Sequence, residues 1–114
     1  MQITEIAYFT EQVEEMAAFY QRLLEVEPVA RSEDMAIFLS GETRIFIHRS
    51  YQPQGDELPP ENHTAFRVAD VDAAAASLAA KGLVLEVAPR DFYWGRSAYL
   101  RDPDGHLIEL IQEE

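Results

Sequence analysis

The chain has 114 residues, of which 47% are hydrophobic and 26% are charged, a composition typical of one globular domain. It contains no cysteine, so disulfides and thiolate metal sites are excluded, and any metal must be held by nitrogen and oxygen. A formal net charge of -12 disfavours phosphate backbones and anionic lipid headgroups as partners. With no pattern of a membrane span or secretion signal, we expect a cytoplasmic protein that binds small molecules, and neither nucleic acid nor membrane.

The first module, residues 1–50, has the pattern of a βαβββ unit. Residues Gln2 to Phe9 alternate as a strand does, and Thr10 offers an N-cap for a helix with apolar residues at three- and four-residue spacing. Three further strands are predicted at Pro28 to Arg31, Met35 to Leu39 and Arg44 to His48.

The second module, residues 62–114, repeats this order after a linker over 51–61 that is rich in proline. Its expected elements are a strand from His63 to Val68, a helix from the N-cap Asp70 to Lys81, and strands at Leu83 to Ala88, Ser97 to Arg101 and Leu107 to Gln112. The sequence therefore predicts a single α+β domain in which two tandem βαβββ modules form a curved, partly open mixed sheet around a central pocket, with the helices outside.

Strand alternation predicts which side chains face that pocket, because residues two apart lie on the same face of a strand. It turns Glu5, His48, His63 and Glu109 inward from four strands, and the repeat relates Glu5 to His63 and His48 to Glu109. Glu109 interrupts a strand that is apolar on both sides, which is costly unless a cation or donor meets it. Two imidazoles and two carboxylates suit a divalent transition metal such as Zn, Ni, Co, Mn or Fe.

Each of these four residues also has a simpler interpretation. Glu5 suits a surface position near the terminus, His48 a strand end, and His63 the exposed edge of the linker. Glu109 has Arg44 and Arg67 as alternative partners.

Other residues are candidates for substrate binding: Arg44, Phe46 and Arg67 on inward faces, and Tyr93 and Trp94 in an aromatic cluster. The cluster, residues 92–94 followed by a glycine, suits stacking on a flat cationic ligand or anchoring of its own loop. We interpret Asp102, Asp104 and His106 as turn residues, because an ordered series of calcium ligands is missing.

The segment from Tyr99 to Ile111, YLRDPDGHLIELI, resembles the closing signature of the vicinal oxygen chelate superfamily, which includes glyoxalase I, bleomycin-resistance proteins, fosfomycin-resistance proteins and extradiol dioxygenases. Residues 19–24 are similar to the first-helix motif, and residues 63–72 to the start of the second module. The resemblance implies metal ligands at Glu5, His48, His63 and Glu109, and a homodimer. Many members carry histidine where this chain has Glu5, and glyoxalase I-like members often carry glutamate where it has His48.

The resemblance implies a metal-dependent, glyoxalase-like lyase or isomerase whose substrate chelates the ion through adjacent oxygens, with Glu109 or Glu5 as the catalytic carboxylate. An extradiol dioxygenase with Fe(II) on two histidines and a carboxylate is an alternative. A fosfomycin-type thiol transferase ranks third, because cationic groups are few. The competing class is a metal-free protein that sequesters a ligand, as bleomycin-resistance proteins do.

Overall fold

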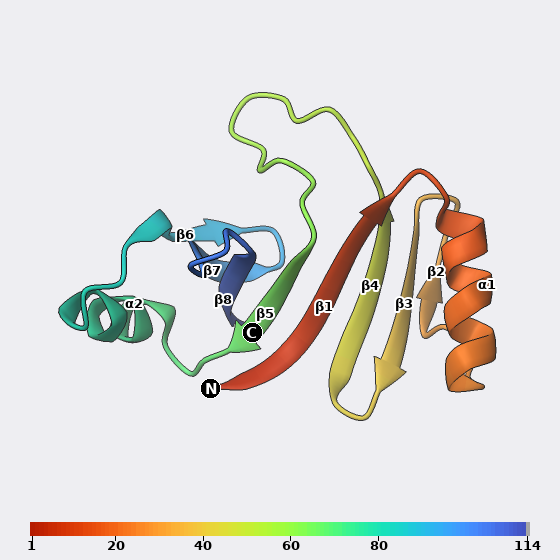
Figure 1. Ribbon diagram of the computed structural model, residues 1–114, viewed down its shortest axis with the longest axis horizontal. Helices are drawn as coiled ribbons and strands as arrows, with labels where there is room; N and C mark the ends of the chain where they lie inside the picture. The colour runs from red at the N-terminus through yellow and green to blue at the C-terminus, as the bar shows by residue number, and fades with distance from the viewer. Residues whose placement is uncertain (114) are drawn as a thin grey trace. The chain divides into compact units, whose positions relative to one another are not determined.

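The computed structural model describes residues 1–113, which fall into two compact units (Figure 1). We call residues 5–62 the N-terminal unit, and residues 1–4 together with the chain from His63 onward the C-terminal unit. The first strand is divided between them at Thr4, whose hydroxyl donates to Glu113 Oε1 at 3.2 Å within the C-terminal unit.

The N-terminal unit contains a four-stranded mixed sheet and one helix. Its strand order is β2-β3-β4-β1, with β1 parallel to β4 and the other neighbours antiparallel. The elements in chain order are β1 (Gln2–Thr10), α1 (Val13–Leu24), β2 (Ala30–Arg31), β3 (Met35–Ser40) and β4 (Thr43–Arg49).

Helix α1 packs on this sheet through an apolar stripe, and the core beneath it contains Ala17, Ala36, Phe38 and Ile47. Tyr20 of α1 stacks on Tyr8 of β1 with ring centroids 6.1 Å apart, so Tyr8 faces the helix as strand alternation predicted. Burial and the neighbouring Tyr8 raise the pKa of Tyr20.

The predicted N-cap of α1 is wrong. Gln12 occupies the N-cap and makes no side-chain capping bond. Thr10 lies two residues earlier, at the end of β1, where its Oγ1 accepts a hydrogen bond from the Gln12 amide at 2.9 Å. The threonine thus shapes the turn into the helix rather than its first turn.

The C-terminal unit repeats the arrangement with the strand order β5-β8-β7-β6, in which β5 is parallel to β8. Asp70 is the N-cap of its helix, as predicted, and accepts from the Ala73 amide at 3.0 Å. The elements are β5 (His63–Arg67), α2 (Val71–Ala80), β6 (Leu85–Phe92), β7 (Gly95–Arg101) and β8 (Leu107–Gln112).

Several predicted strand boundaries are wrong, as β2 and β6 show. Strand β2 has only two residues and starts at Ala30 rather than at Pro28. Strand β6 starts at Leu85, because Gly82 turns the chain with a φ of +86° and leaves Val84 exposed, and it continues past the predicted end to Phe92. Pro89 is compatible with β6 because β6 is an edge strand, where a missing N–H leaves no partner unpaired.

The predicted α+β class and the tandem βαβββ order are confirmed. The strands of each unit pair in mixed directions, and each unit has one helix. Residues 50–62 form neither helix nor strand. Neither helix within residues 1–113 is long and apolar enough to cross a membrane.

Candidate functional site

The most distinctive polar group of the C-terminal unit is the carboxylate of Glu109, which lies in the middle of β8 and is only 2% exposed. Its Oε1 lies 3.1 Å from His63 Nε2 on the neighbouring strand β5. Its Oε2 accepts a hydrogen bond from the Ser97 hydroxyl at 2.7 Å and another from the Trp94 indole at 3.1 Å. The cost of burying this carboxylate is therefore offset by hydrogen bonds.

These side chains form a closed polar cluster, because the Trp94 indole also lies 3.1 Å from Ser97 Oγ. Ser97 has no exposed surface, and it lies two residues before Tyr99, the β7 residue that pairs with Glu109. Alternation along β7 thus places Ser97 and Tyr99 on the same face of the sheet. We name His63, Trp94, Ser97 and Glu109 the Glu109 cluster.

Trp94 reaches Glu109 from the turn between β6 and β7. Its ring stacks on Phe92 with centroids 4.5 Å apart and an angle of 7° between the planes. The Phe92 ring also makes a cation–π contact with the Arg90 guanidinium, whose Cζ lies 4.5 Å from the ring centroid. Gly95 closes the turn at a φ of +142°, where a Cβ would lie 2.7 Å from Gln112 O, so no other residue fits here without displacement.

In the N-terminal unit, Glu5 of β1 forms an ion pair with Arg44 of β4, with Arg44 Nε 2.9 Å from Glu5 Oε1. Both side chains are partly exposed, so the pair adds little to stability. Glu5 and Arg44, both predicted site residues, are thus partners of each other and lie in register on neighbouring strands, so they share one face.

The register of the parallel strands corrects the predicted equivalence of the modules. Glu5 and His63 each precede the first residue of their unit's helix by eight positions, which supports their match, and they pair with Arg44 and Leu107 respectively. Two residues further along, Ala7 pairs with Phe46 as Ala65 pairs with Glu109. The counterpart of Glu109 is therefore Phe46, not His48. The sequence misled because the loops of the two modules differ in length.

His48 pairs in register with Phe9, at the level that Ile111 occupies in the other unit. Its Nδ1 lies 2.7 Å from Arg49 O, a carbonyl oxygen that can only accept, so Nδ1 is the donor in this hydrogen bond. The imidazole is surrounded by the rings of Phe9, Phe46 and Tyr51, at centroid distances of 5.9, 5.5 and 6.1 Å respectively. Its role as a metal ligand stays a prediction that the register does not favour.

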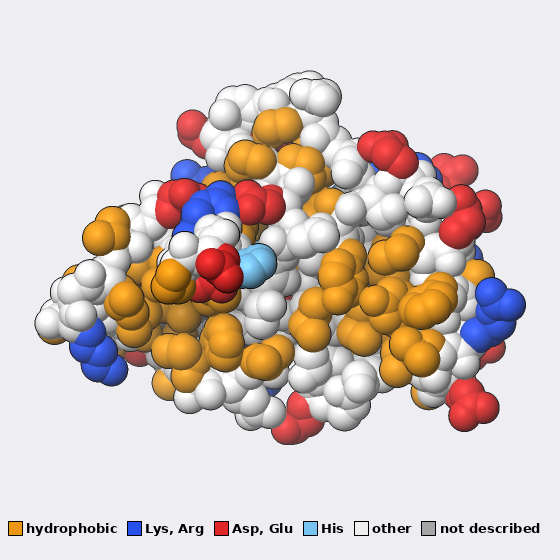
Figure 2. Space-filling view, viewed as in Figure 1, with side chains coloured by type: hydrophobic (Ala, Val, Ile, Leu, Met, Phe, Trp, Pro, Cys, Tyr) orange, Lys and Arg blue, Asp and Glu red, His pale blue; other side chains and the backbone are white. Residues whose placement is uncertain are grey.

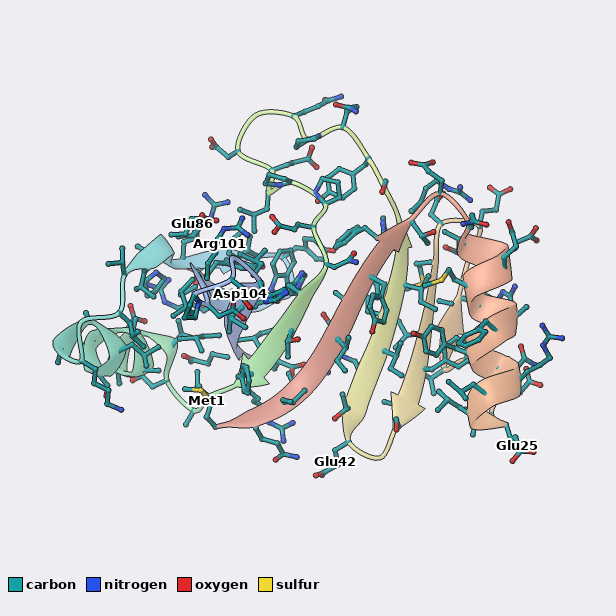
Figure 3. The ribbon with its side chains drawn as sticks, in the orientation of Figure 1. Met1, Glu25, Glu42, Glu86, Arg101 and Asp104 are labelled. Carbon is teal, nitrogen blue, oxygen red and sulfur yellow. The ribbon has the colours of Figure 1, made fainter. Side chains whose placement is uncertain are left out.

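The turn that precedes β8 is structural, as expected. Asp102 Oδ1 accepts from the amides of Asp104 and His106, and the His106 ring lies 2.9 Å from Asp102 Oδ2. The amide of His106 and its ring together lower the pKa of Asp102. Arg101 extends the turn by pairing with Glu86 at 2.9 Å, two residues that lie side by side in Figure 3.

The remaining substrate candidates differ in their surroundings. Arg67 is exposed at the end of β5. Tyr93 is 96% exposed and meets Trp94 edge to face at 4.8 Å. The aromatic turn lines a shallow hollow of about 370 Å³ whose rim carries two carboxylates; its lining residues are Asp91, Phe92, Tyr93, Trp94, Gly95 and Glu113. We name it the β6–β7 hollow.

The Glu109 cluster fits a divalent metal in its chemistry. Nitrogen and oxygen ligands bind such ions at about 2.0–2.2 Å, so neighbouring ligand atoms lie about 3 Å apart. His63 Nε2 and Glu109 Oε1 are separated by 3.1 Å, which suits two ligands of one ion. Ser97 and Trp94 occupy the other carboxylate oxygen and so supply the supporting hydrogen bonds typical of ligating carboxylates.

The fold and this cluster define a member of a known class. A profile of the Glyoxalase/Bleomycin resistance protein/Dioxygenase superfamily matches residues 2–110. The chain belongs to this superfamily, the vicinal oxygen chelate proteins, as its closing signature predicted. A search of curated protein sequences gives no match.

Solved structures agree on the fold at low sequence identity. The hypothetical protein BH1468 of Bacillus halodurans C-125 is similar with a TM-score of 0.77 and 16% identity, covering 99% of this chain and 94% of that one. Methylmalonyl-CoA epimerase of Mycobacterium tuberculosis gives 0.72 and 19%, covering 99% and 88%. A Streptomyces coelicolor methylmalonyl-CoA epimerase, in complex with 2-nitronate-propionyl-CoA, gives 0.69 and 22%, covering 99% and 94%.

Proposed function

We propose that this protein is a divalent-metal-dependent lyase or isomerase of the vicinal oxygen chelate superfamily. The observation that carries the proposal is the separation of 3.1 Å between His63 Nε2 and Glu109 Oε1, with Oε2 of the same carboxylate hydrogen-bonded by Ser97 and Trp94. Zn, Ni, Co, Mn and Fe all accept such ligands.

Glu5 is the third proposed ligand. It occupies the same register position in its module as His63 does in the other, and it brings a second negative charge to balance the ion. The fourth equivalent position holds Phe46, which has no ligand atom. The proposed set is therefore one imidazole and two carboxylates, with room for substrate oxygens.

A bound ion would supply positive charge where an enolate or oxyanion develops on the substrate. Of the two carboxylates, Glu5 is the better group for moving the proton. Glu109 is fixed by two donors on one oxygen, whereas Glu5 is bound to the partly exposed side chain of Arg44. In the proposed reaction Glu5 removes a proton from the carbon beside the carbonyl and returns it to the adjacent carbon or face.

Arg44, Phe46 and Arg67 are proposed to contact the substrate. Arg44 is positioned by Glu5, and Phe46 presents a ring beside it on the same strand. The two methylmalonyl-CoA epimerases suggest acyl thioesters as one substrate class to test. The glutathione hemithioacetal of methylglyoxal represents the other.

The test is reconstitution followed by detection of proton exchange. Protein stripped of metal is loaded with Zn, Ni, Co, Mn or Fe(II) and incubated in deuterium oxide with the hemithioacetal or with a 2-methyl-branched acyl-CoA. We expect deuterium at the carbon beside the carbonyl, dependent on the ion and lost in Glu5→Gln. Absence of exchange with every ion and both substrates would contradict the proposal.

A second candidate, sequestration of a flat organic cation without chemistry, is favoured by the β6–β7 hollow. The hollow combines exposed aromatic surface at Tyr93 with the carboxylates of Asp91 and Glu113, and the chain carries a net charge of -12. Titration of metal-free protein with a bleomycin-like cation separates the two functions. Saturable binding that is lost in Tyr93→Ala supports sequestration; no binding at submillimolar ligand opposes it.

We also propose a homodimer, as the family resemblance implied. Hydrophobic side chains gather over the sheet and helix of the N-terminal unit (Figure 2), and Phe19 and Leu23 of α1 are 53% and 60% exposed. Exposed apolar surface of this kind is typical of an interface. Light scattering during size exclusion should give twice the mass of the chain, whereas a single-chain mass would contradict the dimer.

A further inference from the structure

We infer that Trp94 and Ser97 are positioning residues: they engage Oε2 of Glu109 and leave Oε1 as the oxygen that would hold an ion beside His63. This inference deepens the proposed function and rests on it. It concerns what the two donors do to the ligand, and not the presence of the metal itself.

The two oxygens of the Glu109 carboxylate have different hydrogen-bond partners. Both donors converge on Oε2, with the Ser97 hydroxyl at 2.7 Å and the Trp94 indole at 3.1 Å. Oε1 faces His63 Nε2 alone among these side chains, at 3.1 Å. An ion that took both carboxylate oxygens would have to displace two charge-assisted hydrogen bonds in a site where Ser97 is fully buried and Glu109 is 2% exposed.

The donors are themselves held in place. Ser97 Oγ donates to Glu109 and lies within hydrogen-bond distance of the Trp94 indole, so its hydroxyl direction is fixed. The Trp94 ring is fixed by its stack on Phe92 and by the turn at Gly95, where only glycine avoids a 2.7 Å approach to Gln112 O. The turn between β6 and β7 therefore acts as a support for the ligand on β8.

The indole donor has a second consequence. Trp94 is the only tryptophan of the chain, so the protein has one indole N–H, and it points at the proposed ligand. The indole resonance in a proton–nitrogen correlation spectrum therefore reports directly on the Glu109 carboxylate, with or without metal.

The first experiment needs no metal. The single indole resonance is compared between the wild-type protein and Glu109→Gln, both stripped of metal. Exchanging a charged acceptor for a neutral amide weakens the bond, so we expect the indole proton to move upfield. An indole resonance that is unchanged in Glu109→Gln would overturn the inference, whatever the protein does with metals.

The second experiment measures Zn²⁺ affinity by calorimetry in wild type, Trp94→Phe and the control Tyr51→Phe. Trp94→Phe keeps a ring to stack on Phe92 but removes the N–H. We expect about tenfold weaker binding, as for loss of a supporting hydrogen bond to a ligand. Tyr51→Phe removes only a hydroxyl that donates to Leu58 O in the linker and should bind as wild type does.

The outcomes separate the two proposals. Wild-type protein that binds no Zn²⁺ contradicts the proposed function, while the indole shift still tests the contact with Glu109. Wild-type binding with unchanged affinity in Trp94→Phe overturns the positioning role. A purely structural Trp94 would lower the free energy of unfolding without changing the affinity, so the unfolding of each variant is measured in parallel.

Discussion

The two units share one architecture and differ in what they place on it. Both have a βαβββ order and a parallel pair of strands with matching register. At equivalent positions, the C-terminal unit has His63 and Glu109, and the N-terminal unit has Glu5 and Phe46. In the C-terminal unit, the buried Glu109 carboxylate accepts hydrogen bonds from several donors. In the N-terminal unit, Glu5 is paired with Arg44, and the position equivalent to Glu109 holds the apolar Phe46. The two units thus share one topology but carry different side chains at its equivalent positions, and the buried carboxylate lies in the C-terminal unit.

The largest effect is expected from Glu109→Ala, and Phe46→Ala at the equivalent position of the other unit is the comparison. Glu109→Ala leaves the donors of His63, Ser97 and Trp94 without their acceptor in a buried site, which should cost about 3–5 kcal/mol of unfolding free energy. Phe46→Ala removes a partly buried ring and should cost about 1–2 kcal/mol. Urea denaturation measures both; similar values would remove the contrast between the units.

A glycine comparison tests the support beneath the Glu109 cluster. Gly95→Ala adds a Cβ 2.7 Å from Gln112 O at a φ of +142°, whereas Gly41→Ala, at a φ of +62°, meets nothing within 4 Å. We expect a loss of about 1 kcal/mol for Gly41→Ala and about 2–3 kcal/mol for Gly95→Ala, measured by thermal unfolding. Equal losses would mean that the β6–β7 turn can relax.

Adding the missing ligand should make the units more alike. Phe46→Glu gives the N-terminal unit the carboxylate that the other unit has at this register position. Under the proposed function, Zn²⁺ affinity measured by calorimetry should rise about tenfold, as expected for one more supporting carboxylate. Phe46→Leu is the matched control and should leave the affinity unchanged. An equal effect of both substitutions would argue against the register equivalence.

The smallest effect concerns pH. Arg96 of β7 pairs with Asp72 of α2 at 2.7 Å and lowers the pKa of that carboxyl. A carboxyl whose pKa is lowered on folding stabilises the folded protein at pH values above its unfolded-state pKa. This stabilisation is lost as the pH falls through the folded-state pKa. Asp72→Asn should therefore be slightly less stable than wild type at neutral pH and equally stable in strong acid. Thermal unfolding measured over a range of pH tests this. In an Arg96→Gln background the difference should disappear.

Sequence patterns predicted the fold well because it depends on periodicity. Alternation placed Tyr8 on the helix side of β1, and the Asp70 cap and the turn at Asp102 follow from local hydrogen bonding. The site was predicted less completely. His63 and Glu109 were predicted to converge, and His63 Nε2 lies 3.1 Å from Glu109 Oε1. His48 was matched to Glu109, since the sequence does not give the register of strands separated by a long loop.

Ser97 and Trp94 were not recognised as partners of Glu109. The cluster that contains Trp94 was interpreted as a surface for ligand stacking or as an anchor of its own loop, and Ser97 only as the start of a strand. Their role depends on the fold of the β6–β7 turn and on the pairing of Tyr99 with Glu109, which are tertiary features. The one sequence feature that pointed to Ser97 was strand alternation, because residues two apart lie on the same face and Ser97 is two residues before Tyr99.

The most direct test is Zn²⁺ titration by calorimetry of protein that is purified without nickel affinity resin and stripped of metal. The pairing of His63 with Glu109 predicts a single ion per chain in the wild type, with binding lost in His63→Ala and in Glu109→Gln and retained in His48→Ala. No binding by the wild type, or equal binding by wild type and Glu109→Gln, would contradict a metal centre built on this pair.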